Sequence, residues 1–509
     1  MTTARLTLAF TLSLACASLT TCASAARVDG SERPPNIIVF YADDLGWGDL
    51  GVQGTSGRIP TPHLDRLAEQ GLRCVDAHSS SAICTPSRFA LHTGQYHWRR
   101  FHGIVNSFGP SVFQQGDVTL PQVLGDAGYD TALIGTWHLG WDWPALVIDR
   151  DAPFDLTDRR TPPRAEALDW TRPIPDGPLA HGYDRYFGDD VPNFPPYAWI
   201  DGDRVVVAPS EPYAPDPVPT EGSHEGRPGP MVSGWRLDAV MPELTRAAVA
   251  HVEARAQAGS PFFMLFAFTG PHAPIVPSAP FIGTTDVGPY GDFVAECDDA
   301  VGQVLAALER AGLSEDTLVV FTSDNGPEHY AYPRADRFDH RSMGPLRGLK
   351  RDVWEGGHRV PLIVRWPGAI AADRVSDALV GQIDIMATLC DAAGVALPAG
   401  ASPDGRSQLP VWRGEQESVR RSLVHNTFAE RWALRLDDHV YLDHRNGAHS
   451  RVPDGWDVAN GYLPLEHDVQ LYDLRRDLSQ HENLATSEPD QVKTLSAWLA
   501  RIRAGEPGP

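Results

Sequence analysis

The sequence predicts an α/β fold built on a large, mostly parallel central sheet, and two observations carry that prediction. Short apolar runs rich in β-branched and aromatic residues stop abruptly at polar residues and glycine, and segments with helical periodicity follow them. The composition is that of a globular protein, with 42% hydrophobic and 21% charged residues among 509. This length accommodates a large domain, in which helices flank the sheet, and a smaller second domain.

The first 26 residues have the pattern of an export signal. Arg5 precedes an apolar stretch over 6–19, and small residues at 23–25 form a cleavage site. We expect export to the periplasm or secretion, and no transmembrane segment, because no later run reaches the ~18 apolar residues that a span needs. Lipid anchoring at Cys22 is the weaker alternative.

Four apolar runs predict strands that end at polar groups. The runs and the groups that follow them are Asn36–Tyr41 with Asp43 and Asp44, Thr131–Ile134 with His138, Phe262–Phe268 with His272, and Thr317–Thr322 with Asp324 and Asn325. In an open α/β sheet the ligand crevice lies outside the carboxyl ends of the strands. We therefore expect these four groups to converge on one site.

Segments with helical periodicity separate these strands. One predicted helix begins at Pro62, directly after Thr61. Others are predicted near 242–257, 291–312 and 382–393. Residues 141–235 are rich in Pro, Gly and Asp, which predicts loops and short strands over the crevice. Within them, 192–199 is a candidate substrate wall, and a proline-rich packing loop is an equally good interpretation.

The chain changes character from about residue 395, where turn-rich segments and short strands begin. The strand candidates are 422–425, 431–435, 440–442 and 469–472, followed by a final helix with Val492, Leu495, Leu499 and Ile502 at helical spacing. We therefore divide the chain into a signal peptide at 1–26, a large α/β domain at 34–395 and a smaller C-terminal α+β domain at 396–509.

The net charge argues against broad electrostatic partners. Forty-three basic residues face 66 acidic ones, so the formal charge is −23, whereas nucleic acid and anionic membranes need a basic surface. We expect no nucleic-acid partner, and an anionic ligand has to be held by a local site. Lys350 is one of two lysines in the chain, which favours a need for a compact point charge there. An ordinary surface lysine is the alternative.

The segment 84–88, Cys-Thr-Pro-Ser-Arg, is the most informative motif. Pro and Ser are typical of the first turn of a helix, which places Cys84 at a helix N-terminus, where free amides and the helix dipole favour an anion. Arg88, about one turn on, can reach the same point with donors suited to oxyanions. A structural cysteine is the alternative for Cys84. Cys297 and Cys390 fit buried positions in helices.

The polar groups at the strand ends suggest a metal site and acid–base groups. Their carboxylate and amide oxygens are hard donors, which suit Ca²⁺ or Mg²⁺ and not Zn²⁺; these residues are Asp43, Asp44, Asp324 and Asn325. Capping of helices or turns is the alternative for the acidic pairs. His138 and His272 are candidate proton-transfer groups, with a structural histidine as the alternative for each.

Together these residues resemble the type I sulfatases, which mature a cysteine to formylglycine and resemble alkaline phosphatases in fold. The motif at 84–88 carries the resemblance, which extends from 42–49 to 471–474. Segments 192–197 and 227–231 are similar to the branch that contains arylsulfatase A and N-acetylgalactosamine-6-sulfatase.

The resemblance implies a reaction and a role for each residue. A formylglycine-generating maturase would convert Cys84, and Ca²⁺, or alternatively Mg²⁺, would be bound by Asp43, Asp44, Asp324, Asn325 and residue 84. The aldehyde hydrate would attack sulfur with one hydroxyl and release sulfate when the other loses its proton. Arg88 would hold the hydrate, His138 would assist sulfate release, and His272 and Lys350 would bind sulfate or protonate the leaving oxygen. The expected substrate is a sulfated carbohydrate or an aryl sulfate.

One position departs from the pattern of that family. Its Gly-Lys-Trp-His motif reads Gly-Thr-Trp-His at 135–138, and losing one charged contact in such a site commonly costs ~3–4 kcal/mol, roughly 10²–10³ in rate. We hypothesise that another basic group compensates for Thr136. Two alternatives are a phosphate or phosphonate ester hydrolase of the same superfamily, and a sulfoglycan-binding protein that has lost turnover.

Overall fold

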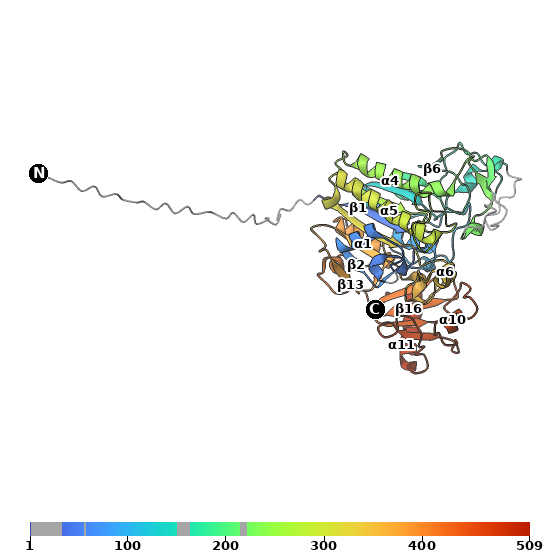
Figure 1. Cartoon of the computed structure of the whole chain (residues 1–509), viewed down its shortest axis with the longest axis vertical. Coiled ribbons are helices and arrows are strands. Elements are labelled where there is room, and N and C mark those ends of the chain that lie inside the picture. Colours follow the sequence, from blue (N-terminus) through green and yellow to red (C-terminus); the bar gives the residue numbers. More distant parts are fainter. Residues whose placement is uncertain (2–32, 55–56, 150–162, 214–220) are drawn as a thin grey trace. The chain divides into compact units, whose positions relative to one another are not determined.

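A ten-stranded sheet forms the centre of the structure, with β1 (Asn36–Ala42) in its middle (Figure 1). The order across the sheet is β13 (Arg374–Ser376), β2 (Leu72–Cys74), β12 (Leu362–Arg365), β11 (Thr317–Ser323), β1, β10 (Phe262–Ala267), β4 (Asp130–Thr136), β5 (Arg185–Asp190), β6 (Ile200–Asp201) and β7 (Arg204–Val205). The neighbours from β11 to β5 are all parallel. Strands β12 and β6 run antiparallel to both of their neighbours. The predicted α/β fold with a mostly parallel sheet is confirmed.

This computed structural model describes residue 1 and residues 33–54, 57–149, 163–213 and 221–509. Pro34–Pro509 form a compact folded unit. Residues 2–26 of the predicted export signal lie outside the described residues. None of the helices in the described part combines the length and the apolar character that crossing a bilayer requires.

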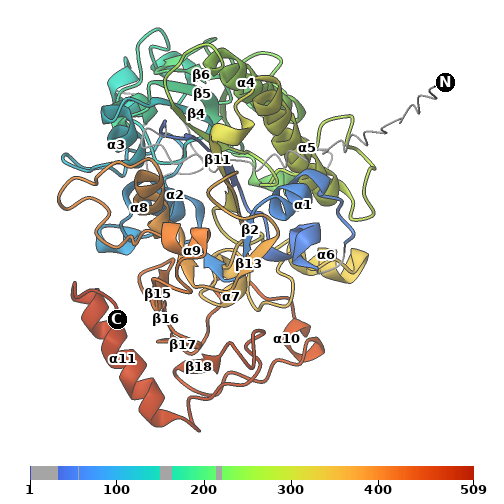
Figure 2. The same ribbon diagram turned by 90° about the vertical axis from the view of Figure 1, so that its left-hand side faces the viewer.

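Side-chain alternation along β1 creates two apolar layers, one on each face of the sheet. Ile37 and Val39 pack into one layer, while Ile38 and Phe40 pack into the other. The first layer contains residues of α2 (Cys84–Thr93), α3 (Leu120–Asp126), α8 (Ile385–Ala392) and α9 (Leu409–Arg413). The second contains residues of α1 (Pro62–Glu69), α4 (Val240–Arg255) and α5 (Pro289–Arg310). Figure 2 shows these two sets of helices on opposite sides of the sheet.

The helices and loops follow the sequence pattern closely. The helices expected near 242–257, 291–312 and 382–393 are α4, α5 and α8, each displaced by only a few residues. The described part of 141–235 contains short strands, among them β8 (Glu211–Tyr213) and β9 (Gly229–Met231), which form a small ladder of their own. Cys74, Cys84, Cys297 and Cys390 are all buried free thiols.

A four-stranded antiparallel sheet follows towards the C-terminus. Its strands are β15 (Ser422–Asn426), β16 (Trp432–Leu436), β17 (His439–Leu442) and β18 (Gln470–Asp473). The last helix, α11 (Pro489–Arg503), packs Leu495, Leu499 and Ile502 into an apolar cluster with this sheet. Strand and helix periodicity predicted each of these elements, whereas the domain boundary at 395/396 stays a prediction.

Besides 3-10 helices, the described part contains five further elements. They are β3 (Ala77–His78), β14 (Val380–Gly381), α6 (Ala331–Phe338), α7 (Glu355–His358) and α10 (Trp456–Ala459). Strand β3 pairs with β14. Val353 and Trp354, just before α7, pack against Val440 of β17, which ties the large sheet's loops to the C-terminal sheet.

Candidate active site

The carboxyl ends of four adjacent parallel strands meet at one edge of the large sheet. Asp43 and Asp44 follow β1, Asp324 and Asn325 follow β11, His138 follows β4, and His272 follows β10. These strands are neighbours in the order β11, β1, β10, β4. Parallel pairing therefore brings four groups that are far apart in the sequence to one place. All of them are buried except His272, which is partly exposed.

Helix α2 positions the cysteine and the arginine of the motif. It begins at Cys84 because Ile83 is extended, with φ −157° and ψ 148°, and it ends at Gly94, whose φ of 60° favours glycine. Its first turn is fixed on both sides: the Thr85 hydroxyl donates to the carbonyl of His138 at 2.9 Å, and the Ser87 hydroxyl donates to the carbonyl of Ser81 at 2.8 Å. Cys84 thus lies at the amide-rich end of the helix.

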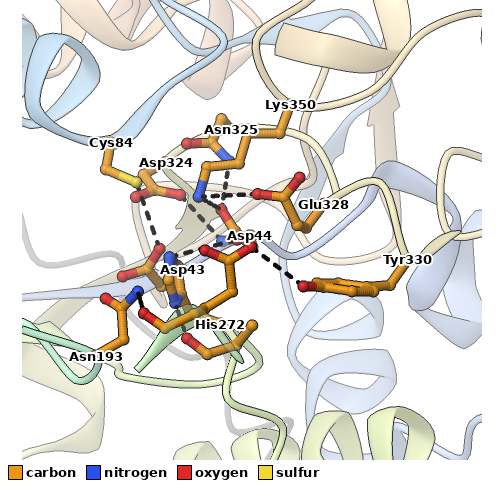
Figure 3. A network of polar contacts seen from close by, with 12 residues as sticks. Asp43, Asp44, Cys84, Asn193, His272, Asp324, Asn325, Glu328, Tyr330 and Lys350 are labelled. Carbon is orange, nitrogen blue, oxygen red and sulfur yellow. Dashed lines mark hydrogen bonds and ion pairs between the residues drawn. The ribbon is translucent and has the colours of Figure 1, made fainter. Parts of the chain in front are cut away.

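Arg88 binds two of the carboxylates at once. Its Nη2 donates to Asp43 Oδ2 at 2.9 Å and to Asp324 Oδ2 at 3.1 Å, and its Nη1 donates to the carbonyl of Thr136 at 3.0 Å. Cys84 Sγ lies 3.8 Å from Asp43 Oδ1, as Figure 3 shows. The planar guanidinium fixes the angle between the two carboxylates, which a lysine cannot do.

Asp44 is the second centre of the network. Lys350 Nζ lies 2.5 Å from Asp44 Oδ1 and 3.9 Å from Glu328 Oε2 (Figure 3). Asn325 Nδ2 donates to Asp44 Oδ1 at 2.7 Å, and His272 Nε2 lies 3.7 Å from Asp44 Oδ2. Lys350 is 2% exposed and belongs to this buried network, not to the protein surface.

The buried charges around Cys84 do not balance. The two salt-bridge sets above contain three carboxylates and two cations, namely Asp43, Asp44, Asp324, Arg88 and Lys350. Glu328 is matched by Arg351, 2.5 Å away. Burial and the repulsion of Asp43 raise the pKa of Asp324 well above its usual value. The excess negative charge is a strong reason for a divalent cation to bind here.

Oxygen atoms suited to such a cation are present. Asp44 Oδ2 and Asn325 Oδ1 are buried and accept no hydrogen bond from any residue that the structure describes. One ligand atom each of Asp43, Asp44, Cys84 and His272 lies within 4.8 Å of the others. Carboxylate and amide oxygens are the preferred ligands of Ca²⁺ and Mg²⁺. The residues present therefore fit a hard divalent ion.

The thiol of Cys84 is a poor nucleophile in this environment. Burial raises its pKa well above the ordinary value, Lys350 opposes that shift, and the surrounding carboxylates reinforce it. The thiolate is the reactive form of a cysteine. An unmodified Cys84 therefore lacks the reactivity that its position at the centre of the network suggests.

His138 is held as a neutral imidazole. Its Nε2 lies 3.0 Å from the carbonyl of Val105, an acceptor, so this nitrogen carries the proton and Nδ1 carries a lone pair. Burial and the nearby Arg88 lower the pKa of His138 to about 3. Its Nδ1 is buried without a partner among the described residues. That nitrogen is available as a proton acceptor in the site.

A pocket of about 300 Å³ opens over the network. Cys84, His138, His272 and Lys350 form part of its lining, and Asn193 and Phe194 come from the segment that we considered as a substrate wall. Phe428 and His449, which follow β15 and β17, also line the pocket. Their rings are stacked, with ring centroids 3.9 Å apart. The C-terminal sheet therefore contributes to the same pocket as the large sheet.

The side chain of Thr136 does not point into the pocket, where a charged residue would contact the substrate. Its hydroxyl donates to the carbonyl of Phe268 at 3.2 Å, its side chain is 1% exposed, and it is absent from the described lining of the pocket. Arg227 does line the pocket, with its guanidinium carbon 3.4 Å from the centre of the Phe194 ring. Phe194 in turn contacts the ring of His138, with ring centroids 5.3 Å apart.

Four charged residues of the pocket were not predicted as site residues from the sequence, namely Glu225, Arg227, Glu328 and Arg351. Glu328 and Arg351 have a usable signal, because Glu328 lies in the loop after β11 and Arg351 directly follows Lys350. Arg227 begins the segment 227–231, which is similar to the arylsulfatase A branch, but nothing in the local sequence marks its side chain as part of the pocket. Its place depends on how the loops between β5 and α4 fold over the strand ends.

Comparison with known proteins agrees with this geometry. The family model described as Sulfatase matches residues 35–395, and a second model, described as N-sulphoglucosamine sulphohydrolase, C-terminal, matches 349–503. The chain is 29% identical to an N-acetylgalactosamine-6-O-sulfatase of Bacteroides thetaiotaomicron, across 96% of this chain and 97% of the relative. It is 32% identical to human arylsulfatase A, across 91% and 86% of the two chains.

A solved structure shows the same fold. It comes from Bacteroides thetaiotaomicron, is described with the metabolism of multiple glycosaminoglycans, and superimposes with a TM-score of 0.77 at 28% identity. The match covers 93% of this chain and 100% of that one. The chain therefore belongs to the sulfatase family, in the branch of N-acetylgalactosamine-6-sulfatase and arylsulfatase A, and is a sulfuric ester hydrolase.

Proposed function

We propose that this protein is an exported carbohydrate sulfatase that uses Ca²⁺ and a formylglycine made from Cys84. The observation that carries this proposal is the position of Cys84. It lies at the N-terminus of α2, 3.8 Å from Asp43, on the floor of a pocket that Lys350 and His272 also line. The buried thiol is unreactive there, whereas an oxygen nucleophile at the same position would face the pocket directly.

The acidic network would hold the metal ion. Its ligands would be the carboxylates of Asp43, Asp44 and Asp324, the amide oxygen of Asn325 and an oxygen on residue 84. Bound there, Ca²⁺ would cancel the excess negative charge and polarise the oxygen of the matured side chain. The hydrated aldehyde of formylglycine would supply an oxygen nucleophile for sulfur at neutral pH.

The protein's own residues then divide the remaining work. Arg88, anchored on Asp43 and Asp324, would orient the matured side chain. Lys350 and His272 would bind the sulfate oxygens or donate a proton to the leaving oxygen. His138, neutral with a lone pair on Nδ1, would take the proton whose loss releases sulfate.

The pocket and the relatives support a sulfated carbohydrate as the substrate class. The Bacteroides thetaiotaomicron relative is named for the 6-O-sulfate of N-acetylgalactosamine. The stacked Phe428 and His449 present an aromatic surface in the pocket, of the kind that packs against the apolar face of a sugar ring. We propose that the sulfate lies over residue 84 and that the sugar extends towards this surface.

Arg227 is the basic group that we propose to compensate for Thr136. It lines the pocket on the Phe194 side, next to His138, and a guanidinium offers paired donors to a sulfate. Arg351 also lines the pocket, and its Nη1 lies 2.5 Å from Glu328 Oε1. Thr136 itself can offer one neutral hydroxyl, which is committed to Phe268.

The proposal is tested on protein co-expressed with a formylglycine-generating maturase. Trypsin releases the peptide Cys74–Arg88, whose mass reports whether residue 84 is a thiol or an aldehyde. We expect the aldehyde, together with Ca²⁺-dependent release of sulfate from N-acetylgalactosamine 6-sulfate. Cys84→Ala should abolish turnover, whereas Cys390→Ala, another buried thiol, should retain it.

Two results would contradict the proposal. One is a thiol at residue 84 when the same maturase converts a control sulfatase. The other is faster release of phosphate than of sulfate from matched esters, which would favour a phosphate or phosphonate ester hydrolase. Export is tested separately, by finding the mature N-terminus after residue 26 in the periplasm or the medium of the native host.

A further inference from the structure

Three buried histidines form a second polar cluster away from the pocket. His78 ends β3, His358 ends α7, and His425 lies in β15, so three distant parts of the chain meet here. Their exposed fractions are 1%, 0% and 1%. One ring nitrogen of each lies within 4.8 Å of the others. None of the three occurs in the described lining of the active-site pocket.

The hydrogen bonds of His78 fix its tautomer. Its Nε2 lies 2.8 Å from Asp76 Oδ1. Asp76 also binds Arg359 at 3.1 Å and Arg435 at 3.2 Å, and although burial opposes ionisation, these two guanidinium groups keep the pKa of Asp76 well below its usual range. Asp76 is therefore a carboxylate that only accepts. His78 Nε2 therefore carries a proton, and in the neutral tautomer Nδ1 carries a lone pair.

The same reasoning applies to His358. Its Nε2 lies 3.3 Å from the carbonyl of Val353, which can only accept a hydrogen bond, so this nitrogen also carries the proton. Its Nδ1 therefore has a lone pair as well. The two Nδ1 atoms of His78 and His358 are only 3.1 Å apart. Two lone pairs at this distance repel unless a proton or a metal ion lies between them.

Two observations favour a metal ion over a proton. The charges of Asp76 and Glu355 are matched by Arg359 and Arg435, so nothing requires a cationic imidazole. Both ring nitrogens of His425 are buried and make no hydrogen bond of ordinary geometry with the described residues, although the Ser79 backbone is close to the ring, and a proton shared by His78 and His358 would not satisfy them.

We propose that His78, His358 and His425 bind a transition-metal ion of the zinc class. Neutral imidazoles are preferred ligands of such ions, and a carboxylate or carbonyl on the opposite nitrogen of each ligand is the usual supporting contact. Asp76 and Val353 provide these contacts. The His425 ring stacks on His358 with centroids 3.6 Å apart, so it has to turn out of the stack to offer a nitrogen to the ion.

The position of the cluster gives the ion a structural role. His425 belongs to the C-terminal sheet, while His78 ends β3 and His358 ends α7. The N–H of Ser79 donates to the carbonyl of His358 at 2.7 Å, and 79–83 leads directly to Cys84. An ion here would hold the C-terminal sheet against the segment that carries the nucleophile.

The test measures metal content of the full chain with Ca²⁺ present throughout. After dialysis against Zn²⁺ and removal of free metal, we expect roughly one equivalent of zinc per chain. His358→Gln and His425→Gln should retain less than about a tenth of that, whereas His97→Gln, a buried histidine outside the cluster, should retain it. Co²⁺ in place of Zn²⁺ should give the visible absorption of a tetrahedral site.

A chelator experiment keeps the proposal testable if the variants fold poorly. A zinc-selective chelator added to the wild-type protein in excess Ca²⁺ should lower its unfolding temperature and leave Ca²⁺ bound. Wild-type protein that takes up no zinc, or cluster variants that hold as much zinc as wild type, would overturn the proposal. A single shared proton between His78 and His358, detected by ¹⁵N NMR in zinc-treated protein, would overturn it too.

Discussion

The acidic network at the pocket and the histidine cluster are both buried and polar, and segment 79–83 connects them. They differ in how the fold builds them. Asp43, Asp44 and Asp324 follow strands of one parallel sheet, and their pocket is open to a ligand. His78, His358 and His425 come from separate elements that meet where two sheets pack. None of the three occurs in the described lining of the pocket.

This difference accounts for their chemistry. Strand ends of one sheet point carboxylates into a crevice, and hard oxygen ligands there favour Ca²⁺ and an anionic substrate. Packing between two sheets seals the imidazoles away from water, and imidazole nitrogens favour a softer ion with no substrate access. Chemistry and architecture are therefore separated within one chain. Substitutions in and outside the two clusters test that separation.

The largest effect is expected for Asp44→Ala. This change leaves Lys350 without its 2.5 Å partner and removes a proposed metal ligand, so kcat/KM for sulfate release should fall by about 10³-fold or more. Calorimetry should show weaker Ca²⁺ binding, while the zinc content stays unchanged.

A buried aspartate outside the site provides the control for that experiment. Asp298 accepts hydrogen bonds from the N–H groups of His63 at 3.1 Å and Leu64 at 2.8 Å. Asp298→Asn should lower stability but leave Ca²⁺ affinity unchanged. Normal Ca²⁺ affinity in Asp44→Ala would instead remove Asp44 from the metal site.

Arg88→Lys tests whether geometry or charge matters in the acidic network. A lysine keeps the charge but cannot bridge Asp43, Asp324 and the carbonyl of Thr136 together, so kcat/KM should fall by roughly 10²-fold. The control is Arg420→Lys, which weakens a buried pair with Asp384, where Nε and Oδ2 are 2.9 Å apart. Arg420→Lys should lower the stability of the protein and leave turnover unchanged. Full activity in Arg88→Lys would show that charge alone suffices.

Asp189 sharpens the comparison because it is a buried carboxylate in neither cluster. Burial and the neighbouring Asp190 raise its pKa to about 7. The folded state thus prefers the protonated acid, and the stability that this contributes is lost as pH rises from about 4 through 7. Asp189→Asn should therefore be more stable than wild type at pH 8, by about 4 kcal/mol, with the difference vanishing near pH 4. Urea unfolding at several pH values measures this; a difference independent of pH would contradict the assignment.

The smallest effect is expected for Thr136→Lys. If Arg227 already supplies the positive charge, adding a lysine should change turnover by less than about tenfold. Arg227→Ala should lower kcat/KM by about tenfold or more, because it removes that charge. The comparison of both variants on N-acetylgalactosamine 6-sulfate decides the matter. A rise above tenfold in Thr136→Lys would refute compensation.

The sequence by itself determined the main sheet and the position of the acidic network. Continuous apolar runs ending in Asp or His predict buried parallel strands, and parallel pairing places such ends together, so local pattern and sheet topology suffice for Asp43, Asp44 and Asp324. The motif at 84–88 predicts a helix start from its first-turn residues, and Cys84 begins α2 as expected.

Only the tertiary structure decided which distant side chains complete these sites. The contact of Lys350 with Asp44, the place of Arg227 over Phe194, and the burial of Thr136 all depend on how long loops pack over the strand ends. The histidine cluster is the extreme case. Its members at 78, 358 and 425 share no spacing or periodicity, because their proximity arises from packing between two sheets, which leaves no pattern in the local sequence.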